Sequence, residues 1–325
     1  MKKKTSTGTL QKEVRQGKVI RNTGSAYVVR LDDGSLVNCR VKGSFRIKGI
    51  RTTNPVAVGD TVDVAHAADD ADYITAIHPR RNYIIRRASN LSKESHIIAS
   101  NLDRAVLVAS LRDPATPTTF IDRFLATAEA YNVNAMLLLN KCDLWDEDDR
   151  ELADAILYLY RSIGYPSYAV SARTGEGIEE LRQLFHDSVT LLSGNSGVGK
   201  SSLINAIVPG ASLRTGEISD IHHTGTHTTT FSEIIDLPGG GELIDVPGVK
   251  GFGVIDFEPA EVSHFFPEIF KESSGCRYGD CRHTGEPGCA VAAAVADHRI
   301  SESRYNSYLS VLEEATEADK YRKPY

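Results

Sequence analysis

Short runs in which apolar and polar residues alternate fill the first quarter of the chain. Turn-forming residues separate the runs, which are 18–22, 26–31, 35–41, 58–64 and 73–78. Alternation with a period of two is typical of half-buried β-strands. The Asp33-Gly34 pair between two runs predicts a hairpin with a two-residue turn, in which both central residues take positive φ. Six or so short strands over about sixty residues predict an OB-like barrel, with an SH3-like barrel as the alternative.

A polar, arginine-containing stretch around residues 82–100 follows the barrel region. Polar clusters between periodic segments are typical of connectors. We therefore predict a domain boundary here and assign residues 1–85 to a first domain that consists of a basic N-terminal segment and the OB-like barrel.

From about residue 103 the pattern changes, because apolar runs typical of buried strands begin to alternate with segments of helical spacing. The predicted strands are 103–110, 134–140, 167–172, 189–194, 231–237 and 242–248, and the predicted helices are 119–131, 151–163, 177–185 and 200–207. This alternation predicts a parallel, doubly wound α/β sheet. We assign residues 86–258 to this domain and residues 259–325 to a mainly helical third domain.

The composition is that of an ordinary globular protein, with 41% hydrophobic and 25% charged residues among 325. These values argue against disorder. No apolar stretch approaches the roughly 20 residues needed to cross a bilayer, and the lysine-rich opening has no apolar segment behind it to make a signal peptide. We therefore expect a cytoplasmic protein with no membrane partner.

Charge is unevenly distributed along the chain. The net charge of −6 argues against a nucleic-acid partner, because proteins bind polyanions by neutralising phosphates with Lys and Arg. Residues 1–60, however, hold thirteen Lys and Arg against four Asp and Glu, an excess of nine positive charges. Since OB folds commonly bind single-stranded or irregular nucleic acid, this excess favours RNA as a partner of the barrel.

One segment fits a phosphate-binding loop and stands between a predicted strand and a predicted helix. It comprises Gly194, Asn195, Ser196, Gly197, Val198, Gly199, Lys200 and Ser201, followed by Ser202. In such a loop, glycines let backbone N–H groups surround the β-phosphate and the helix N-terminus adds positive potential. We expect Lys200 to reach the β- and γ-oxygens and Ser201 to bind Mg²⁺. A flexible glycine turn is the alternative, which the strand–loop–helix setting disfavours.

A second pattern follows the predicted strand that ends at residue 140. It is the guanine-recognising NKxD sequence, formed by Asn140, Lys141, Cys142 and Asp143. A carboxylate there accepts two hydrogen bonds from the N1–H and exocyclic amine of guanine, whereas adenine offers neither donor in that position. Ser171 and Ala172, at the end of the next strand, resemble the element whose backbone N–H approaches the guanine carbonyl. Together these residues predict selection of GTP over ATP.

Two further elements complete the set. Asp245 and Gly248, in the sequence DVPG, match the DxxG element, whose Asp holds Mg²⁺ through water and whose Gly N–H senses the γ-phosphate. A plain β-turn is the alternative for this short sequence taken alone. The preceding sequence HTGTHTTT, at 223–230, is where a switch-I threonine should lie, so Thr228 or Thr229 would complete the Mg²⁺ shell.

The order of these motifs is unusual. GTPases ordinarily run from the phosphate loop through switch I and DxxG to NKxD and SA, whereas here NKxD and SA come first. A compact sheet with neighbouring termini tolerates such a rearrangement, because the strands pair in the same way and only the connections move. We therefore predict a circularly permuted P-loop GTPase domain.

Three of the five cysteines crowd into a glycine-rich stretch near the C-terminus. With one histidine they form the set Cys276, Cys281, His283 and Cys289. Three thiolates and one imidazole are the ligands of a closed, structural, tetrahedral zinc site. Iron, or a disulfide among the cysteines, is the alternative, but the expected cytoplasmic setting favours zinc.

The permuted motifs, the barrel, the GxHTTT sequence and the cysteine cluster together resemble the circularly permuted small-ribosomal-subunit biogenesis GTPase family, RsgA, also called YjeQ. The resemblance covers essentially the whole chain. Val246 departs from the DTPG sequence usual in that family, at a position that contacts nothing essential. The resemblance implies a GTPase that acts late in 30S subunit assembly, with nucleotide-dependent binding of 16S rRNA by the barrel and the zinc domain. We also expect a monomer.

The resemblance also bears on catalysis. Ordinary small GTPases often place a glutamine just after the DxxG glycine to orient the attacking water, and here that position is Val249, which cannot do so. The family pattern implies that His227 of GxHTTT takes over this role. The alternative is that His227 is a solvated switch residue and that the partner supplies catalysis.

Two other functions are weighed against an assembly GTPase. One is an RNA-binding scaffold that nucleotide merely stabilises, with vestigial hydrolysis. The other is a metabolic P-loop kinase or ATPase, against which Asp143 argues. Multiple-turnover GTP hydrolysis would exclude the first, and a GTP preference that survives loss of the Asp143 carboxylate would favour the second.

Overall fold

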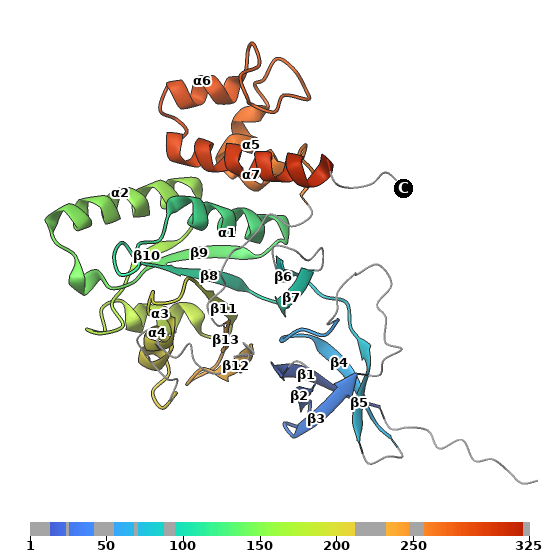
Figure 1. The fold of residues 1–325 in the computed structure, drawn as a ribbon. Coiled ribbons are helices and arrows are strands. Elements are labelled where there is room, and N and C mark those ends of the chain that lie inside the picture. The colour runs from blue at the N-terminus through green and yellow to red at the C-terminus, as the bar shows by residue number, and fades with distance from the viewer. Residues whose placement is uncertain are drawn as a thin grey trace, which may run out of the picture.

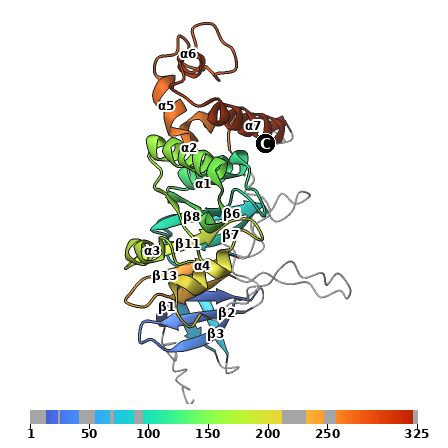
Figure 2. The same ribbon diagram turned by 90° about the vertical axis from the view of Figure 1, so that its left-hand side faces the viewer.

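The structure is a computed structural model that describes residues 14–23, 26–41, 55–67, 71–87, 95–211, 232–246 and 257–320. A barrel, a central sheet covered by helices on both faces, and a helical C-terminal region follow one another along the molecule (Figures 1 and 2). None of the helices in the described part of the chain combines the length and apolar character needed to cross a membrane.

The N-terminal region forms a five-stranded barrel. Its strands are β1 (Val14–Asn22), β2 (Tyr27–Leu31), β3 (Leu36–Val41), β4 (Thr61–His66) and β5 (Asp72–Ile77). They pair in the order β1-β2-β3-β5-β4, with β3 and β5 parallel, and β4 pairs again with β1 to close the barrel. Inward-facing apolar side chains, including Val19, Val29 and Ile74, fill its core. The predicted OB-like barrel is confirmed.

The hairpin between β2 and β3 is present, but its turn differs from the prediction. Four residues, 32–35, connect the strands, and only Gly34 among them takes positive φ, at 84°. Its N–H donates to the carbonyl of Leu31, and the N–H of Leu31 donates to Ser35. Asp33 accepts hydrogen bonds from the backbone N–H and the hydroxyl of Ser35. This side-chain bonding stabilises a longer loop than the Asp-Gly pair suggested.

The stretch predicted as a connector contains a second, smaller sheet. Strands β6 (Tyr83–Arg87) and β7 (Ser95–Ser100) pair as an antiparallel hairpin. The hairpin is tied to the barrel because Asp60, fully buried, accepts from Arg80 and Ser100. The sequence between the two strands is polar, and this led to the prediction of a connector although both strands contain apolar residues. The predicted boundary between residues 85 and 86 falls within β6 and stays a prediction.

The central domain is the predicted α/β sheet. Its strands are β8 (Arg104–Ala109), β9 (Asn134–Leu139), β10 (Ser167–Ala169), β11 (Val189–Ser193), β12 (Glu233–Asp236) and β13 (Glu242–Asp245), in the order β10-β9-β8-β11-β13-β12. All are parallel except β12, which is antiparallel to β13. Edge strand β12 also pairs with β1, which joins the barrel to this sheet.

Helices cover both faces of the sheet. They are α1 (Thr118–Ala130), α2 (Glu147–Ile163), α3 (Ile178–Phe185) and α4 (Lys200–Ile207). Neighbouring strand residues point to opposite faces, so Leu107 packs with α1 and α2 while Val106 packs with α3 and α4. Helix α2 begins at a capping box between Asp146 and Asp149 and ends at Gly164 with φ of 117°. These features fix the helix between two defined ends.

The C-terminal region is mainly helical, as predicted. It contains a short 3-10 helix (Val262–Phe265) and helices α5 (Pro267–Ser273), α6 (Ala290–Ala296) and α7 (Glu302–Lys320). A buried ion cluster holds it against α1: Arg304 lies 2.8 Å from Asp122 and 2.6 Å from Glu268. Burial alone would lower the pKa of Arg304, but the charges of the two carboxylates outweigh it and hold the pKa above its usual value.

Candidate functional site

The loops that carry the predicted nucleotide motifs meet at one edge of the sheet. Strands β8, β9, β10 and β11 are parallel, so their carboxyl ends lie together. Ligands of open α/β sheets bind outside such ends. The phosphate-loop sequence follows β11, the NKxD sequence follows β9, and the Ser171-Ala172 pair follows β10.

The phosphate-loop sequence connects β11 directly to α4, as predicted. Two of its glycines are required by their surroundings. A Cβ on Gly194 would lie 2.2 Å from the carbonyl oxygen of Val108, and a Cβ on Gly199 would lie 2.4 Å from Nδ2 of Asn140. Both glycines take positive φ, at 150° and 91°. Only glycine allows the loop to approach the backbone of Val108 and the side chain of Asn140 this closely.

Lys200 is buried at the start of α4. Its Nζ donates hydrogen bonds to the carbonyl oxygens of Gly194 and Asn195, at 2.6 and 2.9 Å. Burial lowers the pKa of Lys200, and the nearby Asp245 carboxylate opposes that shift. Burial likewise raises the pKa of Asp245, against the charge of Lys200. The lysine and the aspartate predicted to act on phosphate and Mg²⁺ therefore share one electrostatic environment.

Asn140 joins two of the loops. Its side chain is buried, and Nδ2 donates to the carbonyl oxygen of Val198 at 2.9 Å while Oδ1 accepts from the backbone N–H of Ala172 at 3.2 Å. Lys141 takes a left-handed conformation with φ of 69°, and its ammonium donates to the carbonyl of Asp113. The first two NKxD residues thus brace the loops around the site.

Asp143, the predicted guanine-reading carboxylate, is held by the next loop. The hydroxyl of Ser171 donates to its Oδ1 at 2.6 Å. Ser171 in turn accepts from the backbone N–H groups of Arg173 and Thr174. The guanidinium of Arg173 lies 3.7 Å from the second oxygen of Asp143 and is 80% exposed. The carboxylate is therefore oriented from the opposite loop.

Two predicted site residues point into the interior. The thiol of Cys142 is buried, and burial together with Glu176 raises its pKa to about 12. Val198 is fully buried, and its backbone carbonyl is used by Asn140. These residues can serve the site through their backbone rather than through their side chains.

Some predicted residues lie outside the described part of the chain, namely His227, Thr228, Thr229 and Gly248. Sequence reasoning in turn missed two contributors. Arg173 directly follows the Ser171-Ala172 pair, so its position was a usable signal. The loop after β8 gave no signal, yet Pro114 lies 3.0 Å from where a Cβ on Gly197 would stand.

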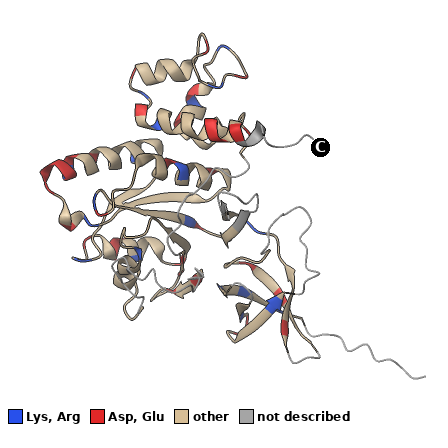
Figure 3. Ribbon diagram, viewed as in Figure 1, with Lys and Arg blue, Asp and Glu red and all other residues tan. Residues whose placement is uncertain are grey.

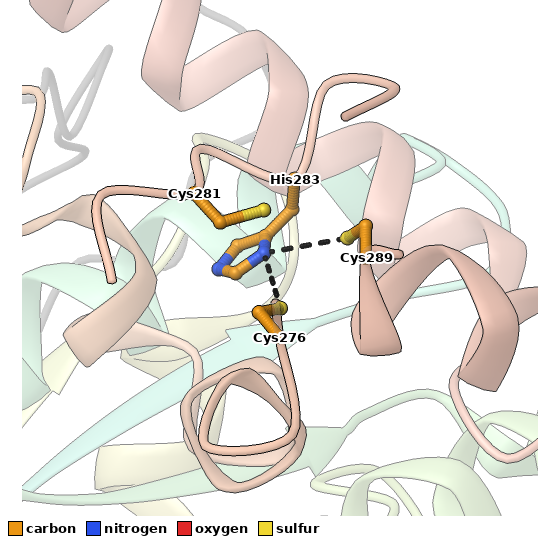
Figure 4. A group of neighbouring side chains, drawn as sticks. All are labelled: Cys276, Cys281, His283 and Cys289. Carbon is orange, nitrogen blue, oxygen red and sulfur yellow. Dashed lines mark hydrogen bonds between the residues drawn. The ribbon is translucent and has the colours of Figure 1, made fainter. Parts of the chain in front are cut away.

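The predicted metal ligands converge in the C-terminal region (Figure 4). The donor atoms of Cys276, Cys281, His283 and Cys289 all lie within 4.8 Å of one another. Nδ1 of the histidine is 3.5 Å from Sγ of Cys276 and 3.6 Å from Sγ of Cys289. A tetrahedral zinc ion with usual bond lengths separates sulfur from nitrogen by about 3.5 Å. The donor set and its spacing therefore fit zinc.

Hydrogen bonds from helix α7 support the loop that carries two of these ligands. Tyr305 donates a hydrogen bond of 2.6 Å to the carbonyl of His283, which takes a left-handed φ of 58°. Tyr308 donates to the preceding carbonyl, that of Arg282, at 2.7 Å. Burial lowers the pKa of His283, which favours the neutral imidazole that binds metals. Helix α7 therefore holds the loop in the shape that brings the four donors together.

Comparison with known proteins agrees with this geometry. Family models described as RsgA N-terminal domain and RsgA GTPase match residues 16–74 and 77–255. The small ribosomal subunit biogenesis GTPase RsgA of Bacteroides fragilis is 57% identical over 310 residues, covering 95% of this chain and all of its own. The RsgA of Porphyromonas gingivalis is 59% identical over 314 residues, covering 95% and 99%.

Solved structures with a similar fold point to the same family. The crystal structure of YjeQ from Thermotoga maritima matches with a TM-score of 0.72 and 32% identity, over 94% of this chain and 99% of that one. The crystal structure of YloQ, a circularly permuted GTPase, matches with a TM-score of 0.69 and 29% identity, over 98% and 99%. The predicted permuted fold is confirmed. This chain belongs to the RsgA GTPase family and is a GTP-hydrolysing enzyme.

Proposed function

We propose that this GTPase acts late in the assembly of the small ribosomal subunit and binds that subunit in a nucleotide-dependent way. The relatives that match nearly the whole chain are named small ribosomal subunit biogenesis GTPases. The main support for a nucleotide-binding site comes from the hydrogen bonds of Asn140. Its side chain links the carbonyl of Val198 to the N–H of Ala172. We therefore assign the phosphate loop and the base-recognition loops to one site.

Guanine is selected by Asp143 in this proposal. Its carboxylate accepts from the N1–H and the exocyclic amine of the base, while the backbone around Ser171 and Ala172 faces the base carbonyl. The hydrogen bond from Ser171 supports this role because it fixes the plane of the carboxylate before nucleotide arrives. The Asn140-to-Asp143 residues and this pair form the base-binding half of the site.

The phosphates are bound by the loop 194–199, by Lys200 and by Ser201 and Ser202 at the start of α4. Mg²⁺ bound with GTP would neutralise charge between the β- and γ-phosphates. Ser201, Thr228 or Thr229, and Asp245 through water would hold the ion, and Gly248 would sense the γ-phosphate. The burial of Lys200 beside Asp245 supports this arrangement, since charges in a desolvated site act strongly on phosphate.

Catalysis of hydrolysis is assigned to His227 as the residue that orients water. Val249 occupies the position where other GTPases often carry a glutamine, and an isopropyl group cannot hold water. Lys200 contributes by stabilising charge on the transferred phosphoryl group. Replacement of His227 by Ala should lower kcat and leave GTP affinity nearly unchanged.

The cysteine cluster holds one structural zinc ion, bound by Cys276, Cys281, His283 and Cys289. Four protein ligands leave no open position for chemistry, so the ion stabilises the C-terminal domain. This domain and the barrel contact 16S rRNA in the proposed complex. We propose three domains, at 1–85, 86–258 and 259–325, in a monomeric cytoplasmic protein.

The basic excess of the N-terminal segment supports RNA binding less than its total suggests. Arg15, Lys18, Arg21 and Arg30 are each paired with a carboxylate of this protein. Basic and acidic positions are interspersed over the barrel among the residues coloured in Figure 3. Arg40 is exposed on β3. RNA contacts are therefore assigned to Arg40 and to the lysines and arginines outside the described residues.

Cosedimentation with purified small subunits tests this function. We expect tight binding with a non-hydrolysable GTP analogue, weaker binding with GDP, and affinity that falls steeply with salt because phosphates are neutralised. Large subunits serve as the matched control. Equal affinity of the GTP-analogue and GDP forms for the small subunit would contradict the proposed nucleotide dependence. Equal affinity for small and large subunits would contradict the small subunit as the specific partner.

A further inference from the structure

Three neighbouring strands carry charged residues at one register position. Arg21 of β1 lies opposite Glu233 of β12, and Glu233 lies opposite Asp245 of β13. Side chains directly opposite one another on neighbouring strands share a face of the sheet. The guanidinium of Arg21 pairs with the carboxylate of Glu233. A row of charges thus leads from the barrel to the aspartate beside the phosphate loop.

Two more basic residues of the barrel hold the opposite end of the β12–β13 hairpin. Lys18 lies 2.9 Å from Glu242, and Arg30 lies 2.5 Å from the other oxygen of Glu242 and 2.8 Å from Asp236. Asp236 and Glu242 face each other across the hairpin. The hydrogen bond with Asp236 is the main cause that raises the pKa of Arg30. The barrel therefore forms ion pairs with both ends of the β12–β13 hairpin.

In the sequence, this hairpin connects two elements of the proposed GTPase site, the switch-I segment and Asp245. Strand β12 begins at Glu233, soon after the predicted switch-I threonines, and β13 ends at Asp245. Strand β13 also pairs with β11, which leads into the phosphate loop, with Asp245 opposite Leu192. Any displacement of the hairpin relative to β11 would move Asp245 relative to Lys200. The position of the barrel and the geometry of the phosphate site are thus mechanically linked.

We propose that Lys18, Arg21 and Arg30 are positioning residues for GTP: they dock the barrel on the β12–β13 hairpin and hold Asp245 where it faces the phosphate loop. The proposal rests on the role proposed above for Asp245. These ion pairs are exposed or only partly buried, and each alone is worth little, so the effect belongs to the set together with the strand pairing. Coupling between sites is reciprocal. If docking of the barrel raises the affinity for GTP by some factor, bound GTP should shift the docking equilibrium towards the docked state by the same factor.

Charge reversal in the full-length chain tests this. Arg30→Glu brings a negative charge against Asp236 and Glu242. In the presence of Mg²⁺, we expect the ratio of affinities for a non-hydrolysable GTP analogue and for GDP to fall by about fivefold or more, the lower end of typical coupling between sites. Amide hydrogen exchange in β1 and β12 should rise with the analogue bound. Arg30→Gln should act in the same direction to a smaller extent.

A compensating change and a control sharpen the result. Asp236→Arg, added to Arg30→Glu, recreates the pair with its charges exchanged and should restore both the affinity ratio and the slow exchange. Arg150→Glu makes the same charge change at an exposed site of α2, outside both the barrel and the β12–β13 hairpin, and should alter neither readout.

Two results would overturn the proposal. One is faster exchange in β1 and β12 of Arg30→Glu with an unchanged affinity ratio, which would mean that docking does not position the site. The other is a loss that Asp236→Arg fails to restore. The role of Asp245 is tested separately, because Asp245→Asn should itself lower the ratio; an unchanged ratio there would reject that role whatever the barrel variants do.

Discussion

The hydroxyl of Ser171 donates a hydrogen bond of 2.6 Å to the carboxylate of Asp143, across the two loops that follow β10 and β9. The bond uses one lone pair of Oδ1 and fixes the plane of the carboxylate. Because the same hydroxyl oxygen accepts two backbone N–H groups, its orientation is itself fixed. Recognition of guanine should therefore depend on a serine as well as on the aspartate.

Ser171→Ala should weaken GTP binding by about fivefold, since a hydrogen bond of this kind contributes about 1 kcal/mol. Discrimination against ATP should fall with it, because a less ordered carboxylate is a poorer acceptor for guanine. Titration with fluorescent GTP and ATP analogues measures both effects. Ser162→Ala, which removes an exposed hydroxyl on α2, is the control. Unaltered guanine selectivity in Ser171→Ala would show that Asp143 needs no support.

Gly199→Ala should abolish nucleotide binding. A Cβ there would stand 2.4 Å from Nδ2 of Asn140 and would also suffer from a φ of 91°. The clash would break the bond between Asn140 and Val198 that joins the loops. Gly164→Ala has a φ of 117° but open space around its Cβ, so it carries the backbone strain without the clash. It should keep GTP affinity, as measured by calorimetry; a similar loss in both variants would mean that strain alone is responsible.

One zinc ion per chain should be present in the purified protein and absent from Cys289→Ser. Structural zinc contributes directly to folding, and Cys289 also accepts a hydrogen bond at the start of α6. Metal analysis and thermal unfolding with and without a chelator measure these effects. Cys39→Ser, in the barrel core, should lower stability without changing zinc content. Full zinc occupancy of Cys289→Ser would contradict the ligand assignment.

Arg304→Ala should destabilise the protein by about 3–5 kcal/mol, because it removes the ionic partner of the buried Asp122 and leaves only the hydrogen bond from Tyr160. The loss should be concentrated in the C-terminal region, since Arg304 joins α7 to α1 and α5. Denaturant unfolding and hydrogen exchange measure size and location. Arg299→Ala removes the exposed pair with Glu272 and should leave stability nearly unchanged, because exposed ion pairs contribute little. Equal losses in the two variants would contradict a special role for the buried cluster.

Local motifs in this chain could be predicted from sequence because their chemistry is fixed by short spacings at strand ends. The phosphate loop, the NKxD residues and the cysteine cluster all lie where the pattern placed them. Contacts between distant segments could not be predicted. Arg304 in α7 meets Asp122 in α1, and Arg30 meets Asp236. In the sequence, Arg30 is one more basic residue, and only the fold shows that its charge is used within the protein.

The hairpin formed by β6 and β7 shows the same limit on a shorter scale. Its loop is polar enough to resemble a linker, and the sequence pattern gave that polarity more weight than the isoleucines of the two strands. Ile84 and Ile98 are buried in the core of the α/β domain. Asn82, just before β6, exchanges two hydrogen bonds with the backbone of Leu102. The two strands of this segment and the residues next to them are therefore packed parts of the fold.

The most direct test of the proposed function is GTP hydrolysis by the full-length protein, alone and with isolated 30S or 50S subunits. We expect a slow intrinsic rate, strong stimulation by 30S only, and loss of both activities in Lys200→Ala. Hydrolysis that 30S does not stimulate, or that 50S stimulates equally, would contradict a role in small-subunit assembly, and activity that survives Lys200→Ala would contradict the assigned site.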